Sequence, residues 1–329
     1  MKYFITPELK SISGGNKYDK NVLDYLHSIG FKIINIHPSN KSNSILKYLN
    51  IFNKIPKNSL VLIDGLIAPN FYTIIDVLTK KYKLILLIHH PVSYENAKFG
   101  ETRLKLKERA IFSKVHSLIT VSKTMKKVIQ GMLNTKKMID VIEPGVDDMY
   151  FNKYIKNNDS HSLVCVGSVI PRKNIEASIN TLSYLDDKWT MSIIGKYSIN
   201  DGYYQYLNNI ISKLNLNSRI RFHGEIENDD DLITLLTKSS VYTCLSHYEG
   251  YGMANIEAGT LGLPLVVSDI PVFHENLKGF NRIYVSPNNY IETARAIDEL
   301  SKRTRTHYNY IPHRWKDVGY KFKRVLNEQ

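Results

Sequence analysis

The sequence has few of the residues that would mark a secreted, zinc-binding or membrane-spanning protein. Its 329 residues include two cysteines, Cys165 and Cys244, and each lies inside a short apolar run. A disulfide framework or a zinc site needs more cysteines at closer spacing, so we expect two buried, reduced thiols. No uncharged stretch reaches the roughly 18–20 residues of a membrane span, and no signal-peptide pattern is recognised. We therefore expect a cytoplasmic protein, peripheral to the inner face of a membrane at most.

Positive charge is concentrated in the first half of the chain. The net charge is +13; residues 1–150 carry 23 basic and 12 acidic side chains, whereas residues 151–329 carry 21 and 19. Within the first half, residues 98–137 hold 11 basic and 2 acidic side chains. Such a field favours an anionic partner: a lipid headgroup, a phosphorylated acceptor or nucleic acid. The alternative interpretation is that the excess charge only keeps the protein soluble.

Short apolar runs alternate with amphipathic segments along the chain, which predicts an α/β protein. Runs such as LILLI at 84–88 are continuously apolar, as expected for strands buried on both faces of a parallel sheet. The expected strands are 2–6, 31–37, 59–65, 83–90, 117–122, 162–169, 189–195, 220–224, 241–246, 263–269 and 282–286. The expected helices are 16–29, 70–80, 101–115, 122–133, 174–185, 203–214, 229–238, 252–261 and 289–303.

A Pro-Gly turn and a polar linker divide this pattern near residue 155. We predict two doubly wound Rossmann-like domains facing a cleft, at residues 1–155 and 156–308. Ligands of such folds bind at the carboxyl ends of the strands. The tail 309–329 is expected to form a helix that returns to the N-terminal domain, with one apolar stripe at Trp315, Val318, Phe322 and Val325.

The stretch HYEGYGMANIEAGTLGLPLVVSD places a glutamate on each side of a glycine-rich turn into a helix. Glycines let the backbone approach a ligand closely, and free amides at a helix N-terminus attract phosphate or hydroxyl oxygens. Glu249 and Glu257 are too far apart to share one proton, but each carboxylate can accept hydrogen bonds from neighbouring sugar hydroxyls. A ligand that suits this site has hydroxyl groups at both ends and phosphate between them, and a nucleotide sugar has this composition.

A second constellation, GSVIPRKNIEASI, supplies positive charge after another strand. Gly167 closes the strand, and Arg172 and Lys173 lie at the turn into the next helix. A planar guanidinium and an ammonium point charge both suit a diphosphate leaving group. The histidines His89 and His90 end a further strand, where they could serve either chemistry or packing.

These motifs together resemble family 4 glycosyltransferases of the glycosyltransferase-B fold. The resemblance rests on the Glu-x7-Glu element EGYGMANIE, followed by AGTLGLPLVVSD. It extends through GSVIPRKN, RIRFHGEI, VIEPGVD, SLITVSKTMKKVI, SGGNKYDKNVLDYL and HRWKDV, and so covers nearly the whole chain. It implies a retaining, metal-independent transferase that binds a nucleotide sugar mainly through its second domain and the acceptor mainly through its first.

The resemblance also implies roles for residues of the second half. Glu249 would hold hydroxyls of the transferred hexose, Glu257 the ribose diol and Lys173 the donor diphosphate. The family carries an arginine directly after the strand glycine Gly167, where this chain has Ser168. We hypothesise that Arg172 supplies the missing guanidinium. Backbone amides would support the sugar and phosphate at Gly250, Tyr251, Gly252, Met253 and Ala254.

In the first half, the resemblance implies that Gly15 brings backbone close to the donor phosphates. His89 would touch the donor sugar near the reacting carbon, and the sequence does not separate it from His90. Neither an Asp-x-Asp motif nor a histidine–carboxylate cluster is recognised, so no metal and no further cofactor are expected.

The favoured function is transfer of a hexose from a UDP- or GDP-linked donor to a hydroxyl of a lipid-linked or surface glycan. The basic segment 98–137 is expected to contact an anionic membrane through its lysines and arginines. Its apolar stripe, expected to face the core, consists of Leu104, Ala110, Ile111 and Val115. An epimerase or hydrolase of nucleotide sugars is one alternative. A basic nucleic-acid-binding protein is the other, although no nucleic-acid motif is recognised and no nucleic acid is expected as partner.

Overall fold

The structure is a computed structural model that describes residues 2–9, 13–30, 33–36, 45–95, 101–133, 136–151, 161–303 and 311–328. The chain divides into two compact units, each built on its own parallel sheet. The first unit comprises Met1–Ser11, Gly15–Gly145 and His313–Gln329, and the second comprises Ile12–Gly14 and Val146–Pro312. The boundary expected near residue 155 lies in 152–160, outside the described residues.

The sheet of the first unit has six parallel strands in the order β2-β1-β3-β4-β5-β6. Because the chain leaves β1 for one neighbour and returns to its other side, the sheet is doubly wound and has a switch point between β1 and β3. The strands are β1 (Lys2–Ile5), β2 (Ile33–Ile36), β3 (Leu60–Asp64), β4 (Lys83–Ile88), β5 (Ser117–Thr120) and β6 (Ile139–Val141).

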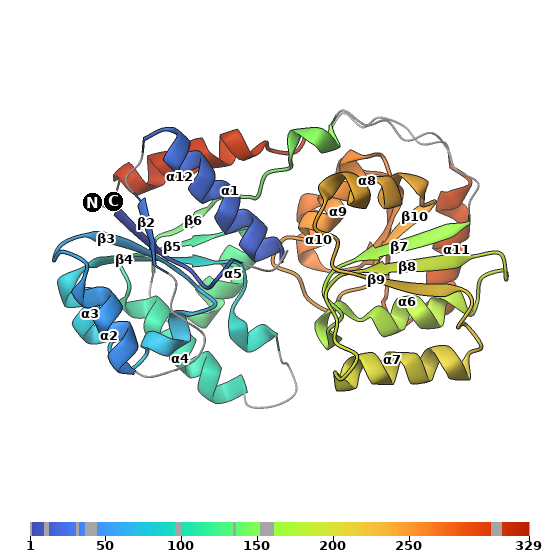
Figure 1. Cartoon of the computed structure of the whole chain (residues 1–329), viewed down its shortest axis with the longest axis horizontal. Coiled ribbons are helices and arrows are strands. Elements are labelled where there is room, and N and C mark those ends of the chain that lie inside the picture. The colour runs from blue at the N-terminus through green and yellow to red at the C-terminus, as the bar shows by residue number, and fades with distance from the viewer. Residues whose placement is uncertain are drawn as a thin grey trace. The chain divides into compact units, whose positions relative to one another are not determined.

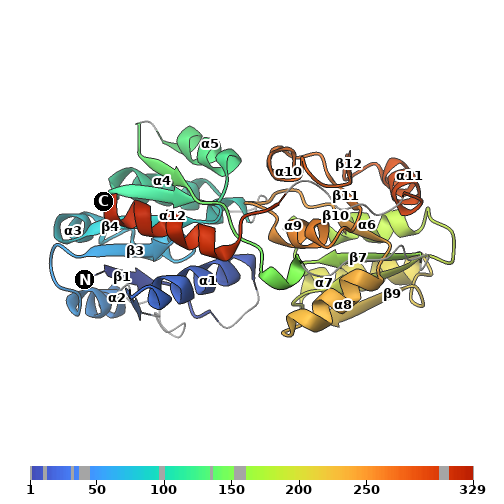
Figure 2. The same ribbon diagram turned by 90° about the horizontal axis from the view of Figure 1, so that it is seen from above.

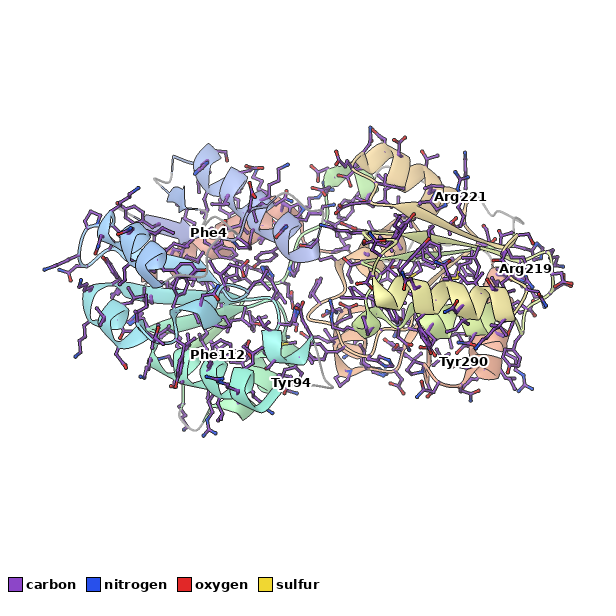
Figure 3. The ribbon with its side chains drawn as sticks, turned by 60° about the horizontal axis from the view of Figure 1, so that its bottom comes forward. Phe4, Tyr94, Phe112, Arg219, Arg221 and Tyr290 are labelled. Atoms are coloured by element: carbon purple, nitrogen blue, oxygen red, sulfur yellow. The ribbon has the colours of Figure 1, made fainter. Side chains whose placement is uncertain are left out.

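Helices cover both faces of this first sheet, with α1 and α12 on one side and α2, α3 and α4 on the other (Figure 1). Phe4 of β1 and Phe112 of α4 belong to its buried core (Figure 3). The helical segments are α1 (Gly14–Ser28), α2 (Ile45–Asn53), η1 (Ala68–Phe71), α3 (Ile75–Lys81), η2 (Val92–Tyr94), α4 (Glu101–Lys114), α5 (Lys123–Met132) and α12 (Trp315–Glu328).

The C-terminal helix α12 is part of the first unit and lies beside α1 (Figure 2). Val318, Phe322 and Val325 of the predicted stripe are buried. The two helices approach so closely that a Cβ on Gly319 would lie 1.9 Å from Cδ1 of Tyr25. The tail therefore completes the core around α1, although almost the whole chain separates the two helices in sequence.

The second unit repeats the scheme with the strand order β12-β11-β10-β7-β8-β9, again all parallel. Its switch point lies between the first strand of the unit, β7, and β10. The strands are β7 (Ser162–Val166), β8 (Thr190–Ile194), β9 (Ile220–Gly224), β10 (Val241–Cys244), β11 (Leu265–Ser268) and β12 (Arg282–Val285).

The helices of the second unit pack on both faces of its sheet, with α6 and α7 opposite α8 and α9 (Figure 1). Arg219, which is labelled in Figure 3, precedes β9. Its Nη2 donates hydrogen bonds to the carbonyls of Leu182 and Asp186, and these bonds connect the α6–β8 turn to the start of β9. The segments are η3 (Asp148–Tyr150), η4 (Pro171–Lys173), α6 (Ile175–Leu182), α7 (Gly202–Lys213), α8 (Asp229–Lys238), α9 (Met253–Thr260), α10 (Pro271–Asn276) and α11 (Tyr290–Ser301).

The predicted α/β class with two doubly wound sheets is confirmed, while some elements differ from the expected ones. The single helix expected at 70–80 is instead the short turn η1, which has a proline in its first turn, followed by α3. Three further elements, α2, β6 and α10, were not expected. Of these, β6 and α10 span only three and six residues, so the sequence periodicity carries little signal there.

Candidate active site

The second unit places its charged constellation at the switch point of its sheet. The loop after β7 carries Arg172 and Lys173, and the loop after the neighbouring strand β10 carries Glu249. The two loops are hydrogen-bonded to each other: Asn174 donates from Nδ2 to the carbonyl of Leu245 at 3.1 Å. Because both strands are parallel, their carboxyl ends bring these loops together at one edge of the sheet.

Two features of the backbone let the β7 loop reach Glu249. At Gly167, φ is +155°, and a Cβ there would lie 3.2 Å from Cε of Lys173, so the lysine side chain runs over the bare strand end. Asn174 then adopts a left-handed conformation, with φ of 49°, between η4 and α6. The backbone carbonyl of Ser168, the residue at the position where the resemblance implies an arginine, accepts a hydrogen bond from the amide of Ile170.

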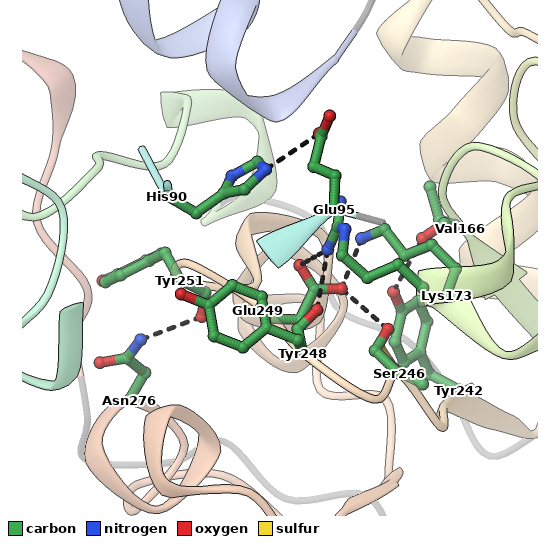
Figure 4. Close-up of polar contacts among 12 residues, drawn as sticks. His90, Glu95, Val166, Lys173, Tyr242, Ser246, Tyr248, Glu249, Tyr251 and Asn276 are labelled. Carbon is green, nitrogen blue, oxygen red and sulfur yellow. Dashed lines mark hydrogen bonds and ion pairs between the residues drawn. The ribbon is translucent and has the colours of Figure 1, made fainter. Parts of the chain in front are cut away.

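Glu249 is buried and forms ion pairs with Lys173 (Figure 4) and with Arg172. Its Oε1 accepts hydrogen bonds from Nζ of Lys173 at 2.5 Å and from Oγ of Ser246 at 2.8 Å. Its Oε2 accepts one from Nη1 of Arg172 at 3.1 Å, and the same guanidinium atom donates to the carbonyl of Tyr248 at 2.8 Å. Two cations on one carboxylate leave one positive charge in excess.

Electrostatics keep Glu249 ionised. Burial acts to raise the pKa of its carboxyl, but attraction by Lys173 and Arg172 outweighs burial and brings the pKa to about 2. The pKa values of the neighbouring thiols shift upward, whereas that of Glu249 shifts downward. Burial raises the pKa of Cys165 to about 12 and also raises that of Cys244. Both cysteines are free, as expected from the sequence.

The glycine-rich turn leads into helix α9 with Gly252 as its N-cap residue. The φ of Gly252 is 90°, and a Cβ there would lie 2.8 Å from Cε1 of Phe273, so a side chain is excluded by both conformation and space. Since glycine offers no capping side chain, the first amides of α9 are available to a ligand. Asn276 fixes the turn by donating to the carbonyl of Tyr251 at 3.0 Å. The turn brings together the predicted donor-binding residues Gly250, Tyr251, Gly252, Met253 and Ala254.

Glu257 lies within α9 and is buried. Its charge, with that of Asp229, acts in the same direction as burial in raising the pKa of Tyr150, whose hydroxyl donates to Oδ1 of Asp229 at 3.4 Å. The structure therefore places Glu257 beside other polar groups of the second unit.

In the first unit, His89 follows β4 and lies at the switch point of the first sheet. Its Nε2 is 3.0 Å from Oδ1 of Asp19 on α1 and 3.9 Å from Oδ2 of Asp64 at the end of β3. The edge of the Tyr18 ring packs against the imidazole, with 5.1 Å between centroids. A Cβ on Gly15 would lie 3.3 Å from Cδ2 of His89, so the predicted phosphate-facing glycine packs against this histidine.

The neighbouring His90 has a different partner. Its Nε2 lies 2.9 Å from Oε1 of Glu95 (Figure 4). The loop between them is held by the buried Glu108 of α4, which accepts hydrogen bonds from the amides of Val92 at 2.6 Å and Ser93 at 3.2 Å. The two histidines, equivalent in the sequence, thus belong to different hydrogen-bonded groups.

Sequence reasoning missed Asp19, Asp64 and Ser246. The expectation that no histidine–carboxylate cluster exists is wrong, because Asp19 from within α1, Asp64 at the end of β3 and His89 directly after β4 come together. The available signal was the position of Asp64 directly at a strand end. Asp19 lies within an amphipathic helix, where an acidic residue normally faces solvent.

A comparison with protein families identifies the chain. The family model for glycosyl transferases group 1 matches residues 146–320, which is more than half of the 329 residues. The chain belongs to the group 1 glycosyl transferases. The match includes the whole of the Lys173–Glu249 constellation and the beginning of α12.

Curated relatives of this group 1 glycosyl transferase include bacterial mannosyltransferases. The O-antigen chain mannosyltransferase RfbU of Salmonella typhimurium is 29% identical over 199 residues, which cover 59% of this chain and 54% of that protein. The GDP-mannose:cellobiosyl-diphosphopolyprenol alpha-mannosyltransferase of Xanthomonas oryzae pv. oryzae is 28% identical over 140 residues, which cover 40% of this chain and 35% of that protein. The chain thus spans about half the length of the first relative and less of the second.

Solved structures show the same architecture. Sucrose-phosphate synthase from Thermosynechococcus elongatus superposes with a TM-score of 0.82 at 15% identity, covering 100% of this chain and 98% of that one. At this identity the likeness concerns the fold alone. The glycosyltransferase-B fold expected from the sequence is therefore confirmed.

Proposed function

We propose that this group 1 glycosyl transferase moves a hexose, with retention of anomeric configuration, from a nucleotide-diphosphate sugar to an acceptor hydroxyl. The ion cluster of Lys173, Arg172 and Glu249 beside the N-terminus of α9 carries the proposal. Its excess positive charge and the helix amides suit a diphosphate, while the ionised carboxylate suits sugar hydroxyls. We assign donor binding to the second unit and acceptor binding to the first.

The proposed chemistry is front-face displacement. The acceptor hydroxyl attacks the anomeric carbon on the side from which the diphosphate leaves, and the departing phosphate oxygen takes the hydroxyl proton. Lys173, Arg172 and the first amides of α9 would stabilise the charge that grows on the diphosphate. Because these groups supply the positive charge that a divalent metal would otherwise bring, we expect transfer to continue in the presence of EDTA.

The similar proteins suggest a donor and an acceptor. Two of them are named as mannosyltransferases, and one name specifies GDP-mannose and a diphosphopolyprenol-linked acceptor. We therefore propose mannose as the hexose, GDP as the nucleotide and a lipid-linked or surface glycan as the acceptor. A UDP-linked hexose is the alternative donor.

Thermal unfolding in the presence of a panel of GDP- and UDP-linked sugars tests the donor. We expect GDP-mannose to raise Tm the most, because a ligand that binds only the folded state stabilises it. The selected donor is then incubated with polyprenol-linked acceptors, and NMR of the product reports the anomeric configuration. Turnover of donor without acceptor would instead indicate the epimerase or hydrolase, and an inverted product would contradict retention.

A peripheral membrane contact through residues 98–137 is a further part of the proposal. Ile111 and Val115 of the predicted stripe are buried, whereas Leu104 and Ala110 are half-buried, so the stripe faces the core of the first unit. Leu106 is exposed on α4 between Lys105 and Lys107, the arrangement expected for insertion among anionic headgroups. None of the described helices has the length and apolar character needed to cross a bilayer.

Sedimentation with anionic liposomes over a salt series tests this contact. We expect binding at low salt that weakens as salt rises, and weaker binding for Leu106→Glu. Ile199→Glu, which changes an exposed apolar side chain of the second unit in the same way, is the matched control. Equal binding of both variants would exclude Leu106 from the contact.

A further inference from the structure

Two buried carboxyl groups meet at the switch point of the first sheet, and no lysine or arginine among the described residues forms an ion pair with them. Asp19 of α1 is 0% exposed and Asp64 of β3 is 2% exposed. Among the described residues, the only ion-pair partner of either group is His89. Two carboxylates placed together in a buried site repel each other and lose their hydration, so at least one must be neutralised.

The hydrogen bonds of the two carboxyl groups leave one buried oxygen atom without a donor. Oδ1 of Asp64 accepts from the amide of Leu66 at 2.6 Å, which orients this carboxyl at the end of β3. Oδ1 of Asp19 faces Nε2 of His89, but Oδ2 of Asp19 is buried and has no hydrogen-bond partner among the described residues. A proton between the two carboxyl groups gives this oxygen the hydrogen bond that a buried polar atom requires.

Electrostatics agree with this placement. Burial raises the pKa of Asp19 to about 7. Burial and the charge of Asp19 also raise the pKa of Asp64, well above its ordinary value. Burial lowers the pKa of His89, which favours the neutral imidazole. The charge of Asp64 acts against burial on the pKa of His89, but burial outweighs it. The Tyr18 side chain packs against the imidazole, and its hydroxyl donates to the carbonyl of Ile142.

We infer that Asp19 and Asp64 share one proton and together hold His89 in a single neutral tautomer. Nε2 of His89 carries the hydrogen and donates it to Oδ1 of Asp19. Nδ1 then keeps a lone pair and can accept a hydrogen bond from a ligand hydroxyl. Asp19 and Asp64 are positioning residues. The consequence for sugar transfer rests on the proposed function and on the contact with the substrate that the resemblance implies for His89.

The geometry also fixes what happens when a second proton is added. Once Asp19 is protonated, its hydroxyl donates to Nε2 of His89, and the imidazole hydrogen moves to Nδ1. His89 then presents a donor in place of an acceptor. The carboxyl pair thereby couples the protonation state of a buried site to the hydrogen bond that His89 offers through Nδ1.

Nitrogen NMR of the histidine side chains tests the tautomer directly, in the protein without any substrate. The His89 signals are assigned as those absent from His89→Gln. Above pH 7.5 we expect a protonated-type Nε2 and an unprotonated-type Nδ1, with the pattern reversing as pH falls through about 7. An imidazolium at pH 8, or the opposite tautomer there, would overturn the inference.

Two variants separate the roles of the carboxyl groups. Asp64→Asn imitates the protonated carboxyl and keeps the Leu66 hydrogen bond, so we expect the tautomer of the native protein. Asp19→Leu removes the acceptor, so we expect a mixture of both tautomers and no reversal near pH 7. Thermal unfolding shows whether each variant is folded; a native tautomer and titration in a folded Asp19→Leu would contradict the inference.

A divalent cation is the other way of neutralising the cluster, whose donor atoms lie within 4.8 Å of one another. Titration with Zn²⁺ and Mn²⁺, followed by elemental analysis of the dialysed protein, distinguishes it. We expect no stoichiometric metal that depends on Asp19. Metal retained at one equivalent, lost in Asp19→Leu and shifting the His89 signals, would overturn the shared proton.

The kinetic test is separate from the spectroscopic one. If the chain transfers sugar, Asp19→Leu should lower kcat/KM by about tenfold, the value of one hydrogen bond, with a smaller loss for Asp64→Asn. The pH profile of kcat/KM should lose its step near pH 7 in Asp19→Leu. If no transfer is found, the NMR result still decides the tautomer, so failure of the proposed function and failure of this inference are distinguishable.

Discussion

The two units place buried carboxyl groups at equivalent points of their sheets, yet the two sites have opposite electrostatics. Glu249 lies at the switch point between β7 and β10, and Asp19 and Asp64 lie at the switch point between β1 and β3. Burial lowers the stability of the charged form at both sites. The pKa of Glu249 nevertheless falls to about 2, whereas that of Asp19 rises to about 7.

Counter-charge explains the difference. Glu249 has an ammonium at 2.5 Å and a guanidinium at 3.1 Å. Among the described residues, the ion-pair partner of Asp19 and Asp64 is His89, and burial lowers the pKa of that imidazole. The second unit therefore holds a permanent ion cluster that leaves excess positive charge for an anionic ligand. The first unit holds a proton near neutral pH. Burial alone does not decide the charge of a carboxyl group; its partners do.

The largest expected effect comes from removing the cation that lies closest to Glu249. Lys173→Met should lower kcat/KM for transfer by about 10²–10³-fold, because the growing charge on the diphosphate loses a preorganised partner. Steady-state kinetics with the selected donor measure the loss. Lys213→Met, an exposed lysine at the end of α7, is the matched control, and a comparable loss there would remove the support for a specific role.

Changing the carboxylate of the ion cluster to an amide should destabilise the protein. Glu249→Gln leaves the half-buried cations of Lys173 and Arg172 without their anion, so we expect the free energy of unfolding at pH 7 to fall by about 3 kcal/mol. The folded-state pKa of Glu249 is depressed, so its stabilisation is complete above about pH 4.5 and is lost as pH falls toward 2. Denaturant titrations across this range should show that loss in the native protein and a flatter profile in the variant.

The same chemical change in the first unit should have the opposite sign. Asp19→Asn removes a carboxylate whose ionisation burial opposes, so we expect a gain of about 1 kcal/mol at pH 8 and little change at pH 4. The folded-state pKa of Asp19 is raised, so its stabilisation is present below about pH 4 and is lost as pH rises toward 7. Denaturant titrations at both pH values measure this, and destabilisation at pH 8 would remove the contrast between the two sites.

The smallest expected effect concerns a neutral member of the ion cluster. Ser246→Ala removes one hydrogen bond to Oε1 of Glu249 but leaves both cations, so we expect a loss of about 0.5 kcal/mol in the free energy of unfolding. Denaturant titration at pH 7 measures it, with Ser183→Ala, an exposed serine after α6, as control. A loss as large as that of Glu249→Gln would mean that the cations are not the dominant partners.

Much of the fold could be predicted from the sequence. Continuously apolar runs between amphipathic segments predicted two parallel sheets, and Trp315, Val318, Phe322 and Val325 predicted the face of α12. Short elements such as β6 could not be predicted, because three residues carry too little periodicity and their pairing with β5 is decided by packing. The split of the helix expected at 70–80 into η1 and α3 was likewise not evident.

The candidate site shows the same division. Strand ends and glycine turns predicted where Lys173, Glu249 and His89 lie along the chain, since the carboxyl ends of parallel strands are where ligands bind. The separation of His89 from His90 could not be predicted, because it depends on whether Asp19 or Glu95 lies within reach of each ring. Asp19 itself gave no signal on its amphipathic helix.

The sequence by itself determined the two parallel sheets, the position of the charged loops at their carboxyl ends and the membership of the glycosyl transferase family. The tertiary structure alone decided which acids obtained a cation and which a proton. The reason is distance along the chain: Lys173 and Glu249 are 76 residues apart and His89 and Asp19 are 70 apart, so their contacts arise only when the sheets form. A pKa depends on those contacts, and no local pattern of residues encodes them.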